Sequence, residues 1–137
     1  MGATELDRVR RLADQVDRGF DPADLVTAAR AEFIALFDLL DCRYEPAPFD
    51  DGPELPTLRR DGTIRGLCSG PGGRGVVCLV PHAMAVPVMS RGRVIGRFVL
   101  DAAPGTTASL DQRVVAVALA DQVGPSLALD RRPLSSA

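Results

Sequence analysis

The fold of this chain is best predicted from residues 82–102, HAMAVPVMSRGRVIGRFVLDA. Two runs rich in valine, isoleucine, methionine and phenylalanine flank a polar break, SRGR, at residues 90–93. Apolar runs of strand length on both sides of a short glycine-containing break predict a β-hairpin. Side chains alternate between the two faces of a strand, so Arg97 and Phe98 must point in opposite directions. We expect Phe98 to pack under helices and Arg97 to lie on the other face of the sheet.

Two helices are predicted before the first strand. The first covers residues 3–18 and ends at Gly19; its apolar stripe consists of Leu6, Val9, Leu12, Ala13 and Val16. The second has Asp21 at the N-cap position and Pro22 at the first helical position, and it runs to about Leu40. The first helix is amphipathic and adds to a domain that already has two covering helices. We therefore expect its apolar stripe to need a partner surface.

The last predicted helix covers residues 109–130. It begins with the sequence SLDQ, in which Ser109 and Gln112 have the spacing of a capping box. Pro125 has no backbone N–H, so a kink or an end of the helix is expected there. Residues 131–137 are predicted to be a disordered tail.

Short strands fill the middle of the chain. They are predicted at 41–46, 63–68 and 75–80 in addition to the hairpin, with a surface loop over 46–62. Strands grouped between terminal helices predict an α+β fold. We expect an antiparallel sheet with the N- and C-terminal helices packed on one face.

The composition limits the function. The chain has 137 residues, enough for one domain, and a formal net charge of −2. This charge offers no electrostatic surface for nucleic acid. No segment has the length of a membrane span, and the charged N-terminus lacks the apolar run of a signal peptide, so a cytoplasmic location is predicted. The three cysteines should then be reduced.

Three stretches together resemble the GAF domain family: AEFIALFDLLDCRYE (31–45), AVPVMSRGRVIGRFVLDA (85–102) and SLDQRVVAVALADQVGPSLA (109–128). Gly96 in VIGRF and the VPV strand carry the most specific part of the pattern. The resemblance is closest to the divergent GAF-like modules of bacterial sensor and two-component signalling proteins. It covers residues 21–130 and leaves residues 1–20 as an added N-terminal helix.

The resemblance implies a non-enzymatic sensory or regulatory domain that forms a homodimer through its terminal helices and contacts a signalling protein. Members of the family typically bind a small ligand under a lid inserted between the middle strands. Here only LVPHAM, residues 79–84, separates the strand at 75–78 from the hairpin. A reduced or vestigial pocket is therefore expected, with no cofactor. A working small-molecule sensor that uses this residual pocket is the alternative.

The candidate ligand-binding residues are Cys68, Cys78, His82 and Arg97. Cys68 and Cys78 have the C-x9-C spacing of free methionine-R-sulfoxide reductases, a redox branch of the family. Ala83 and Val99 stand where that branch has carboxylates, and its third cysteine is missing. The simpler interpretation is that all three cysteines, Cys42 included, are small apolar strand residues.

Other chemistry is not supported by the pattern. Cys68, Cys78 and His82 lack a fourth zinc ligand nearby, and GPGGRG at 70–75 precedes a strand instead of the helix that a phosphate-binding loop requires. No catalytic residue and no metal site is therefore predicted. Two interpretations of Arg97 remain: its side chain contacts an anion, or it contacts water alone.

Overall fold

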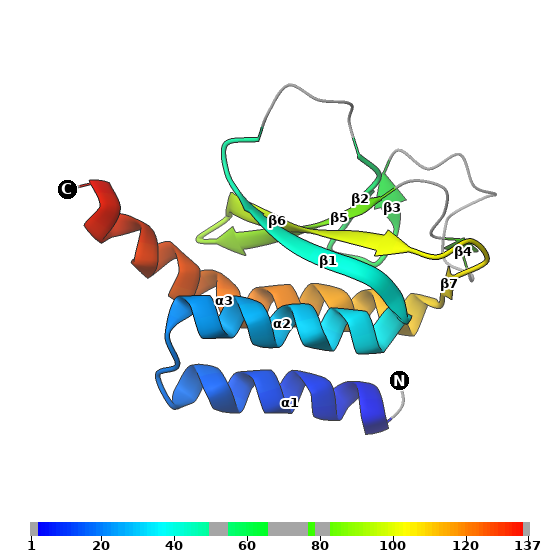
Figure 1. The fold of residues 1–137 in the computed structure, drawn as a ribbon, viewed down its shortest axis with the longest axis horizontal. Helices are drawn as coiled ribbons and strands as arrows, with labels where there is room; N and C mark the ends of the chain where they lie inside the picture. Colours follow the sequence, from blue (N-terminus) through cyan, green and yellow to red (C-terminus); the bar gives the residue numbers. More distant parts are fainter. Residues whose placement is uncertain (1–2, 50–54, 66–76, 79–82, 136–137) are drawn as a thin grey trace.

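The computed structural model of the chain describes residues 3–49, 55–65, 77–78 and 83–135. Its elements follow the predicted order of two helices, a group of strands and a last helix (Figure 1). They are α1 (Ala3–Asp17), α2 (Pro22–Phe37), β1 (Leu39–Pro46), β2 (Thr57–Leu58), β3 (Ile64–Arg65), β4 (Val77–Cys78), β5 (Met84–Ser90), β6 (Arg93–Ala102), β7 (Thr107–Ala108) and α3 (Leu110–Ser135).

The main sheet has five strands in the order β1-β6-β5-β2-β3. The β1–β6, β5–β6 and β2–β3 pairs are antiparallel, whereas β2 runs parallel to β5 with Thr57 opposite Ala85. The sheet is thus mixed, and the expectation of a purely antiparallel sheet needs this correction. It arose because β2 is a two-residue strand inside the proline-rich segment that was predicted to be a loop. β4 and β7 form a separate antiparallel pair.

The predicted hairpin is present as β5 and β6. Its turn residues Arg91 and Gly92 have φ values of 53° and 76°, the positive pair that a two-residue hairpin turn favours because it matches the twist of the strands. Val86 lies opposite Phe98, and Pro87 lies opposite Arg97. The ring of Phe98 is fully buried, with its centroid 4.9 Å from that of Phe33 in α2. Phe98 therefore packs under the helices as predicted.

All three helices lie on one side of the sheet (Figure 1). α2 and α3 pack directly on it, and α1 forms an outer layer against these two helices. Leu12 of α1 is buried, and Glu32 of α2 accepts ion pairs from Arg8 and Arg11 at 3.2 and 3.1 Å. Much of the apolar stripe of α1 is therefore covered within the molecule, which the sequence alone did not indicate.

The helix ends follow local sequence signals. Gly19 has a φ of 75°, the left-handed conformation that ends α1. Asp21 occupies the N-cap position of α2 but makes no side-chain capping hydrogen bond. α2 ends at Phe37, before the predicted Leu40, because Asp38 takes a left-handed conformation with φ 56°.

The capping box of α3 forms as predicted. The N–H of Ser109 donates to Oε1 of Gln112 at 2.8 Å, and the N–H of Gln112 donates to Oγ of Ser109 at 3.1 Å. In addition, Nε2 of Gln112 donates to the carbonyl oxygen of Leu36 at 2.9 Å. This side chain thus satisfies groups at the start of α3 and at the end of α2, and it ties the two helices together.

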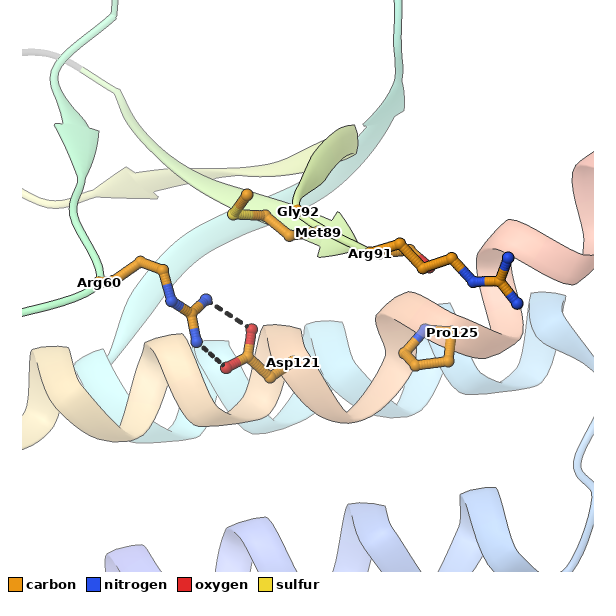
Figure 2. Close-up of a pocket in the computed structure, with 7 residues that line it drawn as sticks. Arg60, Met89, Arg91, Gly92, Asp121 and Pro125 are labelled. Carbon is orange, nitrogen blue, oxygen red and sulfur yellow. Dashed lines mark hydrogen bonds and ion pairs between the residues drawn. The ribbon is translucent and has the colours of Figure 1, made fainter.

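α3 continues through Pro125 to Ser135, past the predicted end at residue 130 and into the predicted tail. The missing N–H of proline costs one helical hydrogen bond, and a bend relieves the clash of its ring with the preceding turn. Figure 2 shows α3 changing direction beside Pro125. At the preceding residue, Gly124, a Cβ atom would lie only 2.1 Å from the carbonyl oxygen of Met89 in β5. Glycine therefore permits α3 to contact the backbone of β5.

Gly96 is needed for a different reason. A Cβ atom at this position would lie 2.1 Å from the hydroxyl oxygen of Tyr44, because the Tyr44 ring covers the glycine from the neighbouring strand β1. The same ring contacts Phe98, with centroids 5.2 Å apart. The glycine of the VIGRF motif thus makes room for an aromatic side chain of the core.

Candidate functional site

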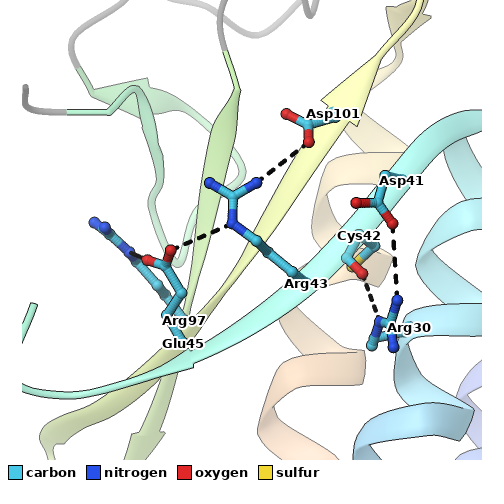
Figure 3. Close-up of polar contacts among 7 residues, drawn as sticks. All are labelled: Arg30, Asp41, Cys42, Arg43, Glu45, Arg97 and Asp101. Carbon is cyan, nitrogen blue, oxygen red and sulfur yellow. Dashed lines mark hydrogen bonds and ion pairs between the residues drawn. The ribbon is translucent and has the colours of Figure 1, made fainter.

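The face of the sheet opposite the helices carries a cluster of charged side chains from β1 and β6. Alternation along the strands places Arg43 and Glu45 of β1 on this face, beside Arg97 and Asp101 of β6. Arg43 contacts Glu45 and Asp101, both at 3.3 Å, and Nε of Arg97 donates to Oε1 of Glu45 at 2.8 Å (Figure 3). Two arginines and two carboxylates neutralise each other, so this cluster has no net charge.

Arg97, the one candidate ligand-binding residue whose side chain is described, lies within this cluster. Its side chain is 21% exposed, and its guanidinium carbon lies 4.1 Å from the centre of the Phe49 ring. The hydrogen bond from Arg97 is the main reason that the pKa of Glu45 is lowered from its ordinary value. Arg97 therefore already has an anionic partner and an aromatic partner from the chain itself.

The centre of this face is covered. Val99 of β6 and Ala85 of β5 point away from the helices by alternation and are nevertheless buried. The cluster around Arg97 therefore lies beside buried apolar residues on the same face.

The described part of the structure does not show whether the other candidate residues lie close together. Cys68 and His82 lie outside the described residues. Cys78 is in β4, opposite Thr107 of β7, but its side chain is outside the described part of the structure. The predicted group of Cys68, Cys78, His82 and Arg97 thus remains a prediction.

Cys42 is a buried thiol of β1. Burial raises its pKa to about 12, which keeps the thiol protonated at neutral pH. The backbone carbonyl of this residue accepts a hydrogen bond from Nε of Arg30 (Figure 3). Cys42 therefore has the environment of a small apolar core residue, as expected from the sequence.

Arg113 is an unexpected feature of α3. It is the largest fully buried side chain of the described residues, and burial lowers its pKa. The sequence contained a signal for this position, since Ala116 and Ala120 follow at helical spacing and share its buried face. The sequence analysis did not consider Arg113, because a charged residue is rarely buried.

A cavity of about 330 Å³ lies between the hairpin turn and α3 (Figure 2). It is lined by Arg60, Met89, Ser90, Arg91, Gly92, Asp121 and Pro125. Across it, the guanidinium of Arg60 donates two hydrogen bonds to the carboxylate of Asp121, at 2.9 and 2.6 Å. No pattern in the sequence indicates this cavity, because its walls come from three segments far apart in the chain.

Metal and membrane sites receive no support from the described residues. Among them, no group of three or more histidine, cysteine, aspartate or glutamate side chains is placed to hold a metal ion. None of the described helices combines the length and the apolar character needed to cross a membrane.

Known proteins resemble this chain in structure and not in sequence. No family model and no curated protein matches it. Among solved structures, the GAF domain from an Acinetobacter phosphoenolpyruvate-protein phosphotransferase matches over 96% of each chain, with a TM-score of 0.62 and 16% identity. The chain therefore has a divergent GAF-like α+β fold, as the hairpin and the terminal helices indicated.

Proposed function

We propose that this chain is a non-enzymatic regulatory domain of the GAF type that self-associates through its terminal helices and has a reduced ligand pocket. The observation that carries the proposal is the GAF-like fold over 96% of the chain. In the matching protein, the domain of this fold belongs to a phosphotransferase. By analogy, we propose that this chain acts as a regulatory domain within a larger signalling or metabolic assembly.

The described side chains support a role without catalysis. The one cysteine whose side chain is described, Cys42, is buried and protonated. On the face of the sheet opposite the described helices, Arg97 and Arg43 are paired with carboxylates of the same cluster. None of these three side chains is an activated nucleophile or an unpaired general base, the groups that catalysis by side chains requires.

The same contacts support a reduced pocket. An incoming anion at Arg97 would have to displace Glu45, which holds the guanidinium at 2.8 Å, and Phe49, which stacks on it. Displacing groups that are already well placed lowers the net affinity, because the gain of the new contact is offset by the loss of the old one.

The terminal helices offer surfaces for self-association. α3 has 26 residues against 15 in α1, and its C-terminal part extends past the ends of α1 and α2 (Figure 1). Large apolar side chains stay exposed on or beside α1, with Leu6 at 44% and Phe20 at 41%. Because Leu12 is buried within the molecule, these outer residues are the ones we assign to the dimer contact.

Sedimentation velocity between about 5 and 500 µM protein tests the association. We expect a concentration-dependent dimer that Leu6→Glu weakens about tenfold, since burying part of a leucine side chain is worth roughly 1.4 kcal/mol. Val94→Glu is the matched control, because Val94 is 45% exposed but lies at the hairpin end of β6. A monomer at all concentrations, or equal weakening by both variants, would contradict the proposed dimer contact.

Small-molecule sensing on the helix-free face is the second candidate function. It is favoured by the location of Arg97, a cation beside an aromatic ring, on the face that the GAF resemblance implies for ligand binding. A thermal-shift screen with cyclic nucleotides and amino acids tests it, since a ligand at a hundred times its dissociation constant adds about 2.7 kcal/mol to stability. The stabilisation should disappear in Arg97→Gln and persist in Arg43→Gln. The absence of any stabilising compound would favour the vestigial pocket.

A further inference from the structure

The cavity between the hairpin turn and α3 is separate from the charged cluster around Arg97. None of its lining residues belongs to that cluster. Its volume of about 330 Å³ lies at the lower end of the range of roughly 300 to 1,000 Å³ that small-molecule sites occupy. It is therefore large enough for a small organic molecule and too small for a folded partner.

Two adjacent residues of α3 shape the backbone beside this cavity. Gly124 lets the helix touch β5, because a Cβ atom there would lie 2.1 Å from the carbonyl oxygen of Met89. Pro125 follows directly, and it has no N–H to donate to the carbonyl of Asp121 one turn earlier. The helix bends beside Pro125, next to the hairpin turn (Figure 2). The cavity is thus a wedge between the hairpin turn and the bent part of α3, with Arg60 and Asp121 on one side.

The lining residues define the chemistry of an occupant. Met89 and Pro125 provide apolar walls on opposite sides. Arg60 and Asp121 neutralise each other through their two hydrogen bonds. Arg91 makes no ion pair with any side chain that the structure describes, and it is exposed at the edge of the cavity. Among the side chains that the structure describes, the lining therefore has one positive charge, that of Arg91, without an ion-pair partner, next to the apolar walls of Met89 and Pro125.

We propose that this wedge binds a small organic monocarboxylate with an apolar body. The body packs between Met89 and Pro125, and the carboxylate takes hydrogen bonds from the guanidinium of Arg91 and the hydroxyl of Ser90. A dianion is disfavoured, because the carboxylate of Asp121 is part of the same wall. This site does not depend on the proposed regulatory function, and its test is separate from the test of self-association.

NMR titration of the full chain with 4-phenylbutyrate tests the proposal. We expect saturable shifts of the amide signals of residues 89–92 and 121, with a dissociation constant of about 1 mM for a ligand of this size. The neutral 4-phenylbutanamide should bind about fivefold more weakly, because it cannot form the charge-assisted hydrogen bond. Inorganic phosphate, which has no apolar body, should produce no saturable shift at these residues.

Arg91→Gln and Arg93→Gln form a matched pair for the same titration. Both arginines are exposed residues of the hairpin end, but only Arg91 lines the cavity. We expect Arg91→Gln to weaken binding of 4-phenylbutyrate about fivefold and Arg93→Gln to leave it unchanged. Equal effects of the two variants, equal affinity for the amide, shifts centred on other residues or no saturation at 10 mM (about ten times the expected constant) would each overturn the proposal.

Discussion

Replacing Gly124 with alanine tests the contact between α3 and the sheet, because two physical effects predict opposite results. Alanine is favoured over glycine in a helix by about 1 kcal/mol. If Gly124 made no contacts, its replacement by alanine would therefore stabilise the protein. In the structure, the new Cβ would lie 2.1 Å from the carbonyl oxygen of Met89 and 3.6 Å from a methyl group of Val88. An ordinary contact of a Cβ atom is 3.4–4 Å, so α3 must move away from β5.

This movement disturbs the part of the core between α3 and β5. Val123, Leu127 and Val88 are buried around the contact, and inserting a group into a close-packed interface costs about 1–3 kcal/mol or more. The obstacle is a backbone atom that cannot rotate away, which puts the cost at the upper end. After subtraction of the helix propensity, we expect Gly124→Ala to lower the free energy of unfolding by about 2 kcal/mol.

Urea unfolding followed by far-UV circular dichroism measures this change, provided that the slope with denaturant is the same in both proteins. Ala31→Gly, on the exposed side of α2, measures the propensity term alone and should cost about 1 kcal/mol. A Gly124→Ala protein as stable as the wild type, or more stable, would show that α3 does not touch β5 at this point.

Three further predictions concern single side chains. Gln112→Ala removes half of the capping box and the bond to the end of α2, and it should destabilise the chain by about 1–2 kcal/mol in urea unfolding; no loss would contradict the assigned hydrogen bonds. Cys42, in a variant whose other two cysteines are serine, should not react with a disulfide reagent at pH 8 until the protein unfolds, because its pKa is raised to about 12; rapid labelling of the folded protein would contradict its burial. Glu45 has a folded pKa below its ordinary value of 4.5, so its contribution to stability is present above about pH 4.5 and is lost as the pH falls through the folded value. The free energy of unfolding of Glu45→Gln should therefore fall less between pH 7 and pH 3 than that of the wild type, and an equal fall would contradict the pairing with Arg97.

The parts of the fold that were predicted correctly have local signals. The hairpin follows from two apolar runs around a glycine-containing turn, and the start of α3 follows from a four-residue capping box. The opposite orientations of Arg97 and Phe98 follow from alternation alone. Each of these features depends on residues close together in the chain, which a pattern can detect.

The features that were missed depend on distant residues. β2 has only two residues, and its parallel pairing with β5 joins Thr57 to Ala85. The ion pair of Arg60 with Asp121 connects positions 61 residues apart, so the cavity that they line has no signature in any window of sequence. The apolar stripe of α1 was detected correctly, but a stripe does not reveal whether its partner is another molecule or the helices α2 and α3.

The continuation of α3 through Pro125 has a similar cause. Proline predicts a break from local chemistry, and the bend beside it is indeed present (Figure 2). Burial of Val123 before the bend and of Leu127 after it holds both parts of the helix on the core. Packing of the helix therefore outweighs the loss of one backbone hydrogen bond.

The central claim is that α2 and α3 cover the same face of one sheet, and nuclear Overhauser contacts measure it directly. We predict contacts between the rings of Phe33 and Phe98, whose centroids are 4.9 Å apart, together with contacts from Gly124 to Val88 and Met89. Phe98 and Val88 point to the same side of the sheet, so both sets place the two helices on that side. Contacts from either helix to the opposite side, at Val99, would contradict the GAF-like arrangement and the function proposed from it.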